Sequence, residues 1–260
     1  MKTKRIVTIS IATAFLLIVL FACVSLFSVR KAEVNFGVLE FTNTEEVQAV
    51  ADGYLGENLM FLDKEEVKAS FSSYNYLEVV SVEKKFPNVL RITLKERREI
   101  YTLENNGVYY VTNEDGFVLA EKSAEEINSD NRNVIKLSLD GVNVTDMSVG
   151  SVIKTDNDEL MKTVFEMAKS ARLTDCIKQI TVKKLASSEP ADVEFTTYTG
   201  VTICVEKAET DGVEKIAAAF DVYDNKISDY EKAFDVLYVF RNSQTGQIQV
   251  TWSDKTVVGS

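Results

Sequence analysis

The side chains that most often carry out chemistry are scarce in this 260-residue chain. It contains no histidine, which is the commonest general base, a common metal ligand and the base of the usual Ser and Cys triads. Of its three cysteines, Cys23 lies in an apolar N-terminal run, while Cys176 and Cys204 are far apart and lack CxxC spacing. The latter two are therefore predicted to be either buried free thiols or an extracytoplasmic disulfide.

Carboxylates are abundant, but their spacing indicates no site. Asp and Glu number 40 against 29 Lys and Arg, and this acidic balance disfavours binding to nucleic acid. Asn113, Glu114 and Asp115 are predicted to be turn residues, because a calcium loop needs a longer alternating ligand set and a distant Glu. No local motif places two carboxylates at the fixed separation that glycoside hydrolysis requires. We therefore expect no catalytic residue, no metal site, no cofactor and no enzyme.

The C-terminal end offers a different chemistry, the pairing of strand backbones. Residues 234–240 and 247–252 are rich in strand-forming side chains, and the polar residues 241–246 separate them. This pattern predicts a terminal hairpin. A strand at the end of a chain tends to lie at a sheet edge, where unpaired backbone groups can bind a strand of another chain. The sequence thus indicates protein binding at this hairpin.

An apolar segment precedes the folded elements. Residues 6–29 carry no charged side chain, and as a helix they span about 36 Å, enough to cross a hydrocarbon core of about 30 Å. Lys2, Lys4 and Arg5 precede this span, which predicts a cytoplasmic tip of residues 1–5, one transmembrane helix and an extracytoplasmic remainder. The alternatives are a cleaved secretory signal and a lipoprotein modified at Cys23, and each of them also exports the remainder.

A strand and two helices are predicted directly after the apolar segment. Residues 32–36 alternate as a short strand. Asn43 then caps a first helix, which is expected to end at Gly56. Asp63 caps a second helix, whose apolar face is expected to continue to Tyr74.

A hairpin completes this first group of elements. Its two strands alternate with a period of two on either side of Pro87-Asn88, and Val80 and Val82 are expected to share one face. The order strand, helix, helix, strand, strand predicts a small sheet with both helices on one face.

Beyond Arg98 the chain is predicted to be mostly β structure with two helices, which makes the whole chain α+β. The turns 105–107 and 114–116 both end in Gly and have the composition of hairpin turns. Helical spacing predicts one helix over 157–172 and another from Gly212, with Ala217 on its inward face. Strands are predicted at 100–103, 108–111, 117–120, 134–139, 177–182, 193–197 and 201–205.

Three runs of sequence resemble a known family. The runs are Gly-Glu-Asn-Leu-Met-Phe-Leu-Asp at 56–63, Val-Glu-Lys-Lys-Phe-Pro-Asn-Val-Leu-Arg-Ile at 82–92 and Lys-Glu-Arg at 95–97. They are similar to a POTRA domain of the FtsQ/DivIB family of bacterial cell division proteins. The resemblance implies a POTRA-like domain at 30–98 directly after the transmembrane helix, a β domain at 99–252 and a tail at 253–260.

The C-terminal hairpin also resembles the closing pattern of that family. In the family this region adds a strand from the partner FtsB, which is itself joined to FtsL. The alternatives are that Tyr238 and Trp252 are buried core residues and that the tail covers the sheet edge. The partner-binding residues implied by this resemblance and by the edge position are Asp235, Tyr238, Gly246, Gln247, Ile248, Gln249, Val250 and Trp252.

The resemblance implies a non-enzymatic membrane scaffold of the divisome. Such a protein would sit at the division septum, bind FtsB/FtsL-type proteins, contact other divisome members through its POTRA-like domain, and help to control septal peptidoglycan synthesis. The alternatives are an exported POTRA-bearing assembly factor and a cell-wall-modifying enzyme.

Overall fold

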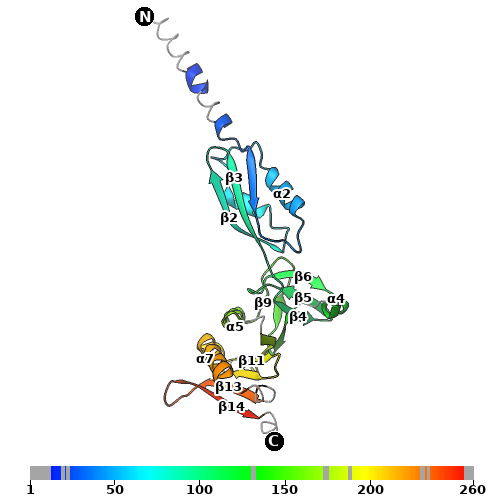
Figure 1. Cartoon of the computed structure of the whole chain (residues 1–260), viewed down its shortest axis with the longest axis vertical. Helices are drawn as coiled ribbons and strands as arrows, with labels where there is room; N and C mark the ends of the chain where they lie inside the picture. Colours follow the sequence, from blue (N-terminus) through cyan, green and yellow to red (C-terminus); the bar gives the residue numbers. More distant parts are fainter. Residues whose placement is uncertain are drawn as a thin grey trace, which may run out of the picture. The chain divides into compact units, whose positions relative to one another are not determined.

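The structure is a computed structural model that describes residues 13–18, 21, 24–129, 133–171, 176–186, 189–228, 232 and 235–254. The chain divides into two compact units, Met1–Arg97 and Arg98–Ser260 (Figure 1). Among the described residues, no helix is long and apolar enough to span a bilayer. The predicted tip and parts of the predicted transmembrane helix, residues 1–12, 19–20 and 22–23, lie outside the described residues.

The first unit is a three-stranded sheet with two helices. Its strand order is β1-β3-β2, in which β1 runs parallel and β2 antiparallel to the central strand β3. This arrangement confirms the predicted order of strand, helix, helix, strand, strand. The elements are β1 (Lys31–Asn35), α2 (Thr44–Asp52), α3 (Lys64–Ala69), β2 (Leu77–Lys85) and β3 (Val89–Glu96).

Both helices of the first unit begin at the predicted caps. The side chains of Asn43 and Asp63 each accept a hydrogen bond from a backbone N–H two residues later, at 2.9 Å. Alternation along β3 directs its apolar side chains to one face, where they form a single core with apolar residues of both helices. The core residues of these elements include Val47, Ala51, Val67, Leu90, Ile92 and Leu94.

Three details of the first unit differ from the prediction. Helix α2 ends at Asp52, not Gly56, because the chain turns at Gly53 and Gly56 has a φ of +92°. Helix α3 ends at Ala69, so Tyr74 lies in the following turns. Val80 does not share the face of Val82, since a bulge in β2 leaves Val80 exposed while Val82 is buried.

The second unit is built on a nine-stranded mixed sheet. Its order is β14-β13-β12-β11-β10-β7-β4-β5-β6, with a separate two-stranded ladder of β8 and β9. The strands are β4 (Tyr101–Asn105), β5 (Val108–Thr112), β6 (Val118–Lys122), β7 (Ile135–Asp140), β8 (Val144–Asp146), β9 (Lys154–Thr155), β10 (Ile177–Lys183), β11 (Asp192–Thr197), β12 (Thr202–Val205), β13 (Asp235–Arg241) and β14 (Ile248–Asp254). The helices are α4 (Ala124–Ser129), α5 (Asp158–Ser170) and α7 (Gly212–Asn225).

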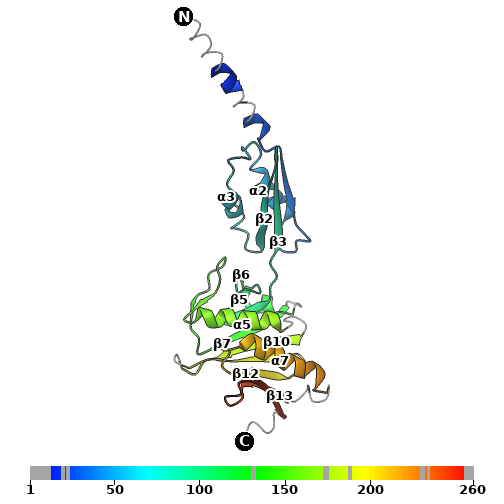
Figure 2. The same cartoon turned by 90° about the vertical axis from the view of Figure 1, so that its left-hand side faces the viewer.

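Helices α5 and α7 cover one face of the large sheet, where they lie side by side (Figure 2). Each sits in a crossover between parallel strands, α5 between β7 and β10 and α7 between β12 and β13. Both predicted helices are confirmed, and α4 is an additional short helix. In α7, Ala219 is buried and Ala217 is exposed, which corrects the inward position predicted for Ala217.

The turn between β4 and β5 has the predicted hairpin geometry. Asn106 and Gly107 have φ values of +53° and +81°, as a two-residue type I′ loop requires. The residues around Asp115 also form a turn, in which the Asn113 side chain accepts hydrogen bonds from the N–H groups of Asp115 and Phe117. The acidic side chains here therefore belong to a turn, as predicted.

Candidate partner-binding edge

The strand β14 forms one edge of the nine-stranded sheet. In the described part of the chain it pairs with β13 alone, through an antiparallel register that joins Leu237 to Trp252 and Val239 to Val250. Asp235 begins β13, Tyr238 lies at its middle, and Gly246 and Gln247 lie in the connecting turn. The remaining predicted residues, Ile248, Gln249, Val250 and Trp252, lie on β14 itself.

The ladder between β13 and β14 fixes which backbone groups face the open edge. Asn242 donates its backbone N–H to the carbonyl of Gln247 at 2.9 Å, which marks this opposed pair as hydrogen-bonded. Hydrogen-bonded and non-hydrogen-bonded pairs alternate in an antiparallel ladder, so the backbone N–H and C=O groups of Gln249 and Thr251 also bond to β13. The N–H and C=O groups of Ile248, Val250 and Trp252 then point outward, where an added strand would find its hydrogen-bonding partners.

The side chains of β14 divide between the two faces of the sheet. Ile248 and Val250 pack against the core beneath α5 and α7, and by alternation Trp252 shares their face. Trp252 nevertheless remains 45% exposed. The alternative in which this tryptophan is a buried core residue is therefore wrong, and an exposed aromatic side chain lies next to an edge that is unpaired among the described residues. The alternative in which the tail covers this edge concerns residues 255–260, which lie outside the described residues.

The turn that joins β13 and β14 is held by its own hydrogen bonds. The Asn242 side chain accepts from the N–H groups of Gln244 at 2.9 Å and Thr245 at 3.1 Å. Gly246, at a φ of +69°, donates its N–H to the Asn242 carbonyl at 2.8 Å. The Arg241 guanidinium donates to the carbonyl of Gly246. These contacts fix the register of the edge strand.

A buried lysine that the sequence did not single out fixes α7 to the chain that precedes it, and an ion pair joins the start of α7 to β13. The Lys215 ammonium donates to the carbonyls of Glu206 at 2.7 Å and Lys207 at 3.1 Å, while burial lowers its pKa. Asp211, at the start of α7, pairs with Arg241 at 2.6 Å. A lysine on a helix usually faces solvent, so the burial of Lys215 could be recognised only from the structure.

Tyr238 lies on the opposite face of the sheet, in a cross-strand row with Cys204 and Glu194. Burial is the largest cause that raises the pKa of the Tyr238 hydroxyl, followed by Cys204 and Glu194. Tyr238 is half-buried, so its exposure lies between that of a core residue and that of a fully exposed surface residue. Both Cys176 and Cys204 carry thiols.

The buried thiol of Cys204 is expected to make the folded chain less stable at alkaline pH. Burial of the thiol, followed by the nearby Glu194, raises the pKa of Cys204 from 9.0 to about 12. Between these values the folded chain keeps a proton that the unfolded chain releases, so stability falls as pH rises, by at most about 1.4 kcal/mol per pH unit. Urea unfolding of the wild type and of Cys204→Ala from pH 8 to 10.5 measures this slope. Parallel pH curves for the two proteins would contradict the assignment.

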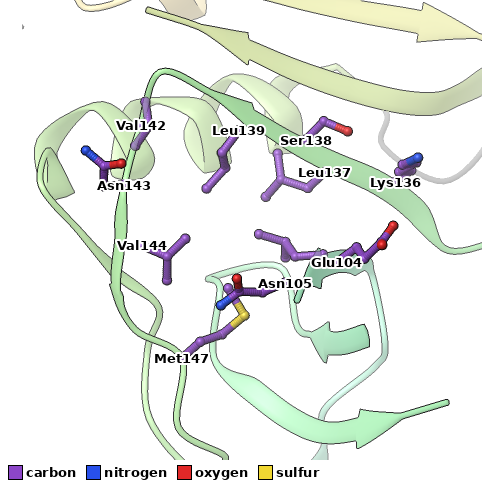
Figure 3. A pocket seen from close by; sticks show the side chains of 11 residues that line it. Glu104, Asn105, Lys136, Leu137, Ser138, Leu139, Val142, Asn143, Val144 and Met147 are labelled. Carbon is purple, nitrogen blue, oxygen red and sulfur yellow. The ribbon is translucent and has the colours of Figure 1, made fainter. Parts of the chain in front are cut away.

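The same unit contains a pocket of about 490 Å³ where β4 and β7 separate (Figure 3). The two strands pair only at Tyr101 with Ile135 and at Thr102 with Lys136, and the pocket opens beyond these pairs. Figure 3 shows Val144 and Met147 beside the gap between Asn105 and Leu139. Glu104 is the only carboxylate among the lining residues, whereas glycoside hydrolysis uses two.

Sequence comparisons place both units among known proteins. Residues 27–97 match the family model for a POTRA domain of the FtsQ type. The cell division protein DivIB of Clostridium botulinum is 23% identical over 214 residues, which cover 82% of this chain and 78% of that protein. DivIB of Clostridium tetani is 30% identical over 97 residues, which cover 37% of this chain and 34% of that protein.

A solved structure is also similar in part. It is the major extracytoplasmic domain of the cell division protein DivIB from Geobacillus stearothermophilus, at 13% sequence identity and a TM-score of 0.28. The similarity covers 51% of this chain and 98% of that one.

Proposed function

Because this chain belongs to the FtsQ/DivIB family of bacterial cell division proteins, we propose that β14 binds a strand of an FtsB/FtsL-type division protein. One observation carries the proposal: β14 is an edge strand whose outward-facing backbone groups alternate with inward-bonded ones, next to the half-exposed Trp252. Each added hydrogen bond contributes about 0.5 to 1.5 kcal/mol, so several such bonds and an aromatic anchor together stabilise a complex.

The family is non-enzymatic and acts in cell division, which confirms the prediction that this chain is no enzyme. Its partners are accordingly protein components of the division machinery. We propose that the chain works as a scaffold that joins early and late division proteins and so helps to control septal peptidoglycan synthesis. The first unit would contact other divisome members.

The membrane attachment belongs to the same proposal. Residues 6–29 form an uncharged run, and three basic residues precede it, which supports a single transmembrane helix with its N-terminus in the cytoplasm. Both compact units would then lie outside the cell membrane. Attachment would hold the β14 edge where single-pass partners present their extracytoplasmic strands.

The proposal is tested in the native cell with a fluorescent tag on the cytoplasmic end. The full chain should collect at the septum, resist carbonate extraction from membranes and co-purify with the FtsB/FtsL-type proteins of that cell. If the chain is spread evenly around the envelope and those proteins do not co-purify with it, the proposal is contradicted. The alternative function is then that of an exported assembly factor.

Trp252→Ala is expected to weaken binding to the same partner by about tenfold, because a half-exposed aromatic residue at an interface commonly contributes more than 1 kcal/mol. The matched control is Tyr198→Ala, since Tyr198 is 47% exposed in the same unit but lies outside β14. Affinities of both variants are compared by titration with purified partner. Equal partner affinities of Trp252→Ala and wild type would show that Trp252 does not contribute to the interface.

A further inference from the structure

A turn of the first unit holds the chain where it leaves the apolar N-terminal segment. Leu59 donates its backbone N–H to the Phe27 carbonyl at 2.7 Å, and Val29 donates to the Glu57 carbonyl at 2.8 Å. Ser28 pairs with Asn58 in an isolated antiparallel bridge. Val29, the last residue of the apolar segment, is itself buried in the core of the unit, so no linker separates the segment from the folded domain.

A second turn, between β2 and β3, meets the same stretch of chain. Arg30 donates its N–H to the Asn88 carbonyl at 2.9 Å. The rings of Phe27 and Phe86 meet edge to face with centroids 5.8 Å apart. Both turns are thus fixed to residues 27–30, which are the last three residues of the apolar segment and the first residue after it.

These two turns present large apolar side chains to solvent. Phe61 is 82% exposed, Phe86 is 59% exposed, and Met60 is also exposed. The Lys84 ammonium donates to the Met60 carbonyl at 3.2 Å, which places a cation among these apolar groups. Exposed Phe and aliphatic side chains beside a lysine are typical of protein surfaces that lie at the boundary between lipid tails and headgroups.

We infer that Met60, Phe61 and Phe86 insert into the outer interface of the membrane that the apolar segment enters. The inference rests on the proposed membrane attachment, and it adds that the first unit docks on the lipid instead of swinging freely above it. Both turns are bonded to residues 27–30, and no linker separates these residues from the apolar segment. The turns therefore have to lie within a few residues of the bilayer surface. The Lys84 ammonium would meet lipid phosphates there.

The single tryptophan makes the docking measurable in the full chain. In a Trp252→Phe background, Phe61→Trp places the only indole on the proposed docking turn. The matched control is Val38→Trp in the same background, because Val38 is 94% exposed but lies beyond the opposite end of β1. Both proteins are reconstituted into phosphatidylcholine and phosphatidylglycerol vesicles with and without acyl-brominated lipid, which quenches indoles at the interface.

The expected result is blue-shifted emission and loss of intensity in brominated vesicles for Phe61→Trp, and neither effect for Val38→Trp. If both proteins resist carbonate extraction yet Phe61→Trp emits like the Val38→Trp control, the docking is wrong while the attachment stands. That outcome would leave the turn as a surface for a protein partner. Extraction of both proteins by carbonate would overturn the attachment, and the docking with it.

Discussion

Val250→Pro is expected to weaken capture of the FtsB/FtsL-type partner by about ten- to a hundredfold, equivalent to about 1.4 to 2.8 kcal/mol. The Val250 N–H points away from β13, so proline removes a donor from the open edge without removing a bond from the existing ladder. The proline ring also obstructs the close approach of an added strand. Titration with purified partner measures the loss.

Val250→Ala is the matched control, because it removes the same packing side chain and keeps the outward N–H. Both variants should lose similar stability, since Val250 is only partly buried against the core. Alanine should bind nearly as wild type does and proline should not. If the two variants bind alike, the partner does not use the backbone of β14, and the strand-addition account fails.

Gly141→Ala is expected to cost about 3 to 5 kcal/mol of stability. Gly141 follows β7 at a φ of +75°, and a Cβ there would lie 1.8 Å from the Lys184 carbonyl oxygen. That oxygen belongs to the backbone, so the strand end has to move. The Lys184 N–H also bonds to the Asp140 carbonyl at 2.8 Å, which resists such movement.

Gly107→Ala separates the clash from the strain of a positive φ. Gly107 has a φ of +81°, but a Cβ there would meet nothing within 4 Å. Its substitution should cost only about 1 kcal/mol, the usual penalty of a left-handed residue with a side chain. Urea unfolding of both variants measures the difference. Equal losses would show that the approach of Lys184 is not what requires glycine at 141.

Local signals in the sequence predicted much of the fold. The Asn43 and Asp63 caps, the Asn106-Gly107 turn and the apolar stripe of α5 each depend on residues within one or two turns of chain. Such interactions require no knowledge of distant strands. The C-terminal hairpin was predictable for the same reason, because a single turn joins its two strands.

Features that depend on distant residues were not predictable. The bulge that exposes Val80 arises from the fit of β2 to β3, and alternation alone gives no sign of it. The burial of Lys215 depends on carbonyl groups in the chain before α7. The exposure of Trp252 could not be decided either, because it depends on how far α7 extends over the sheet edge.

Amide hydrogen exchange along β14 distinguishes strand addition at this edge from any other mode of partner binding. In the free chain, the amides of Gln249 and Thr251 should be protected by β13, whereas those of Val250 and Trp252 should exchange rapidly. Addition of the FtsB/FtsL-type partner should protect Val250 and Trp252 and leave the other two unchanged. Rapid exchange of Val250 and Trp252 in a complex that is demonstrably formed would contradict strand addition at this edge.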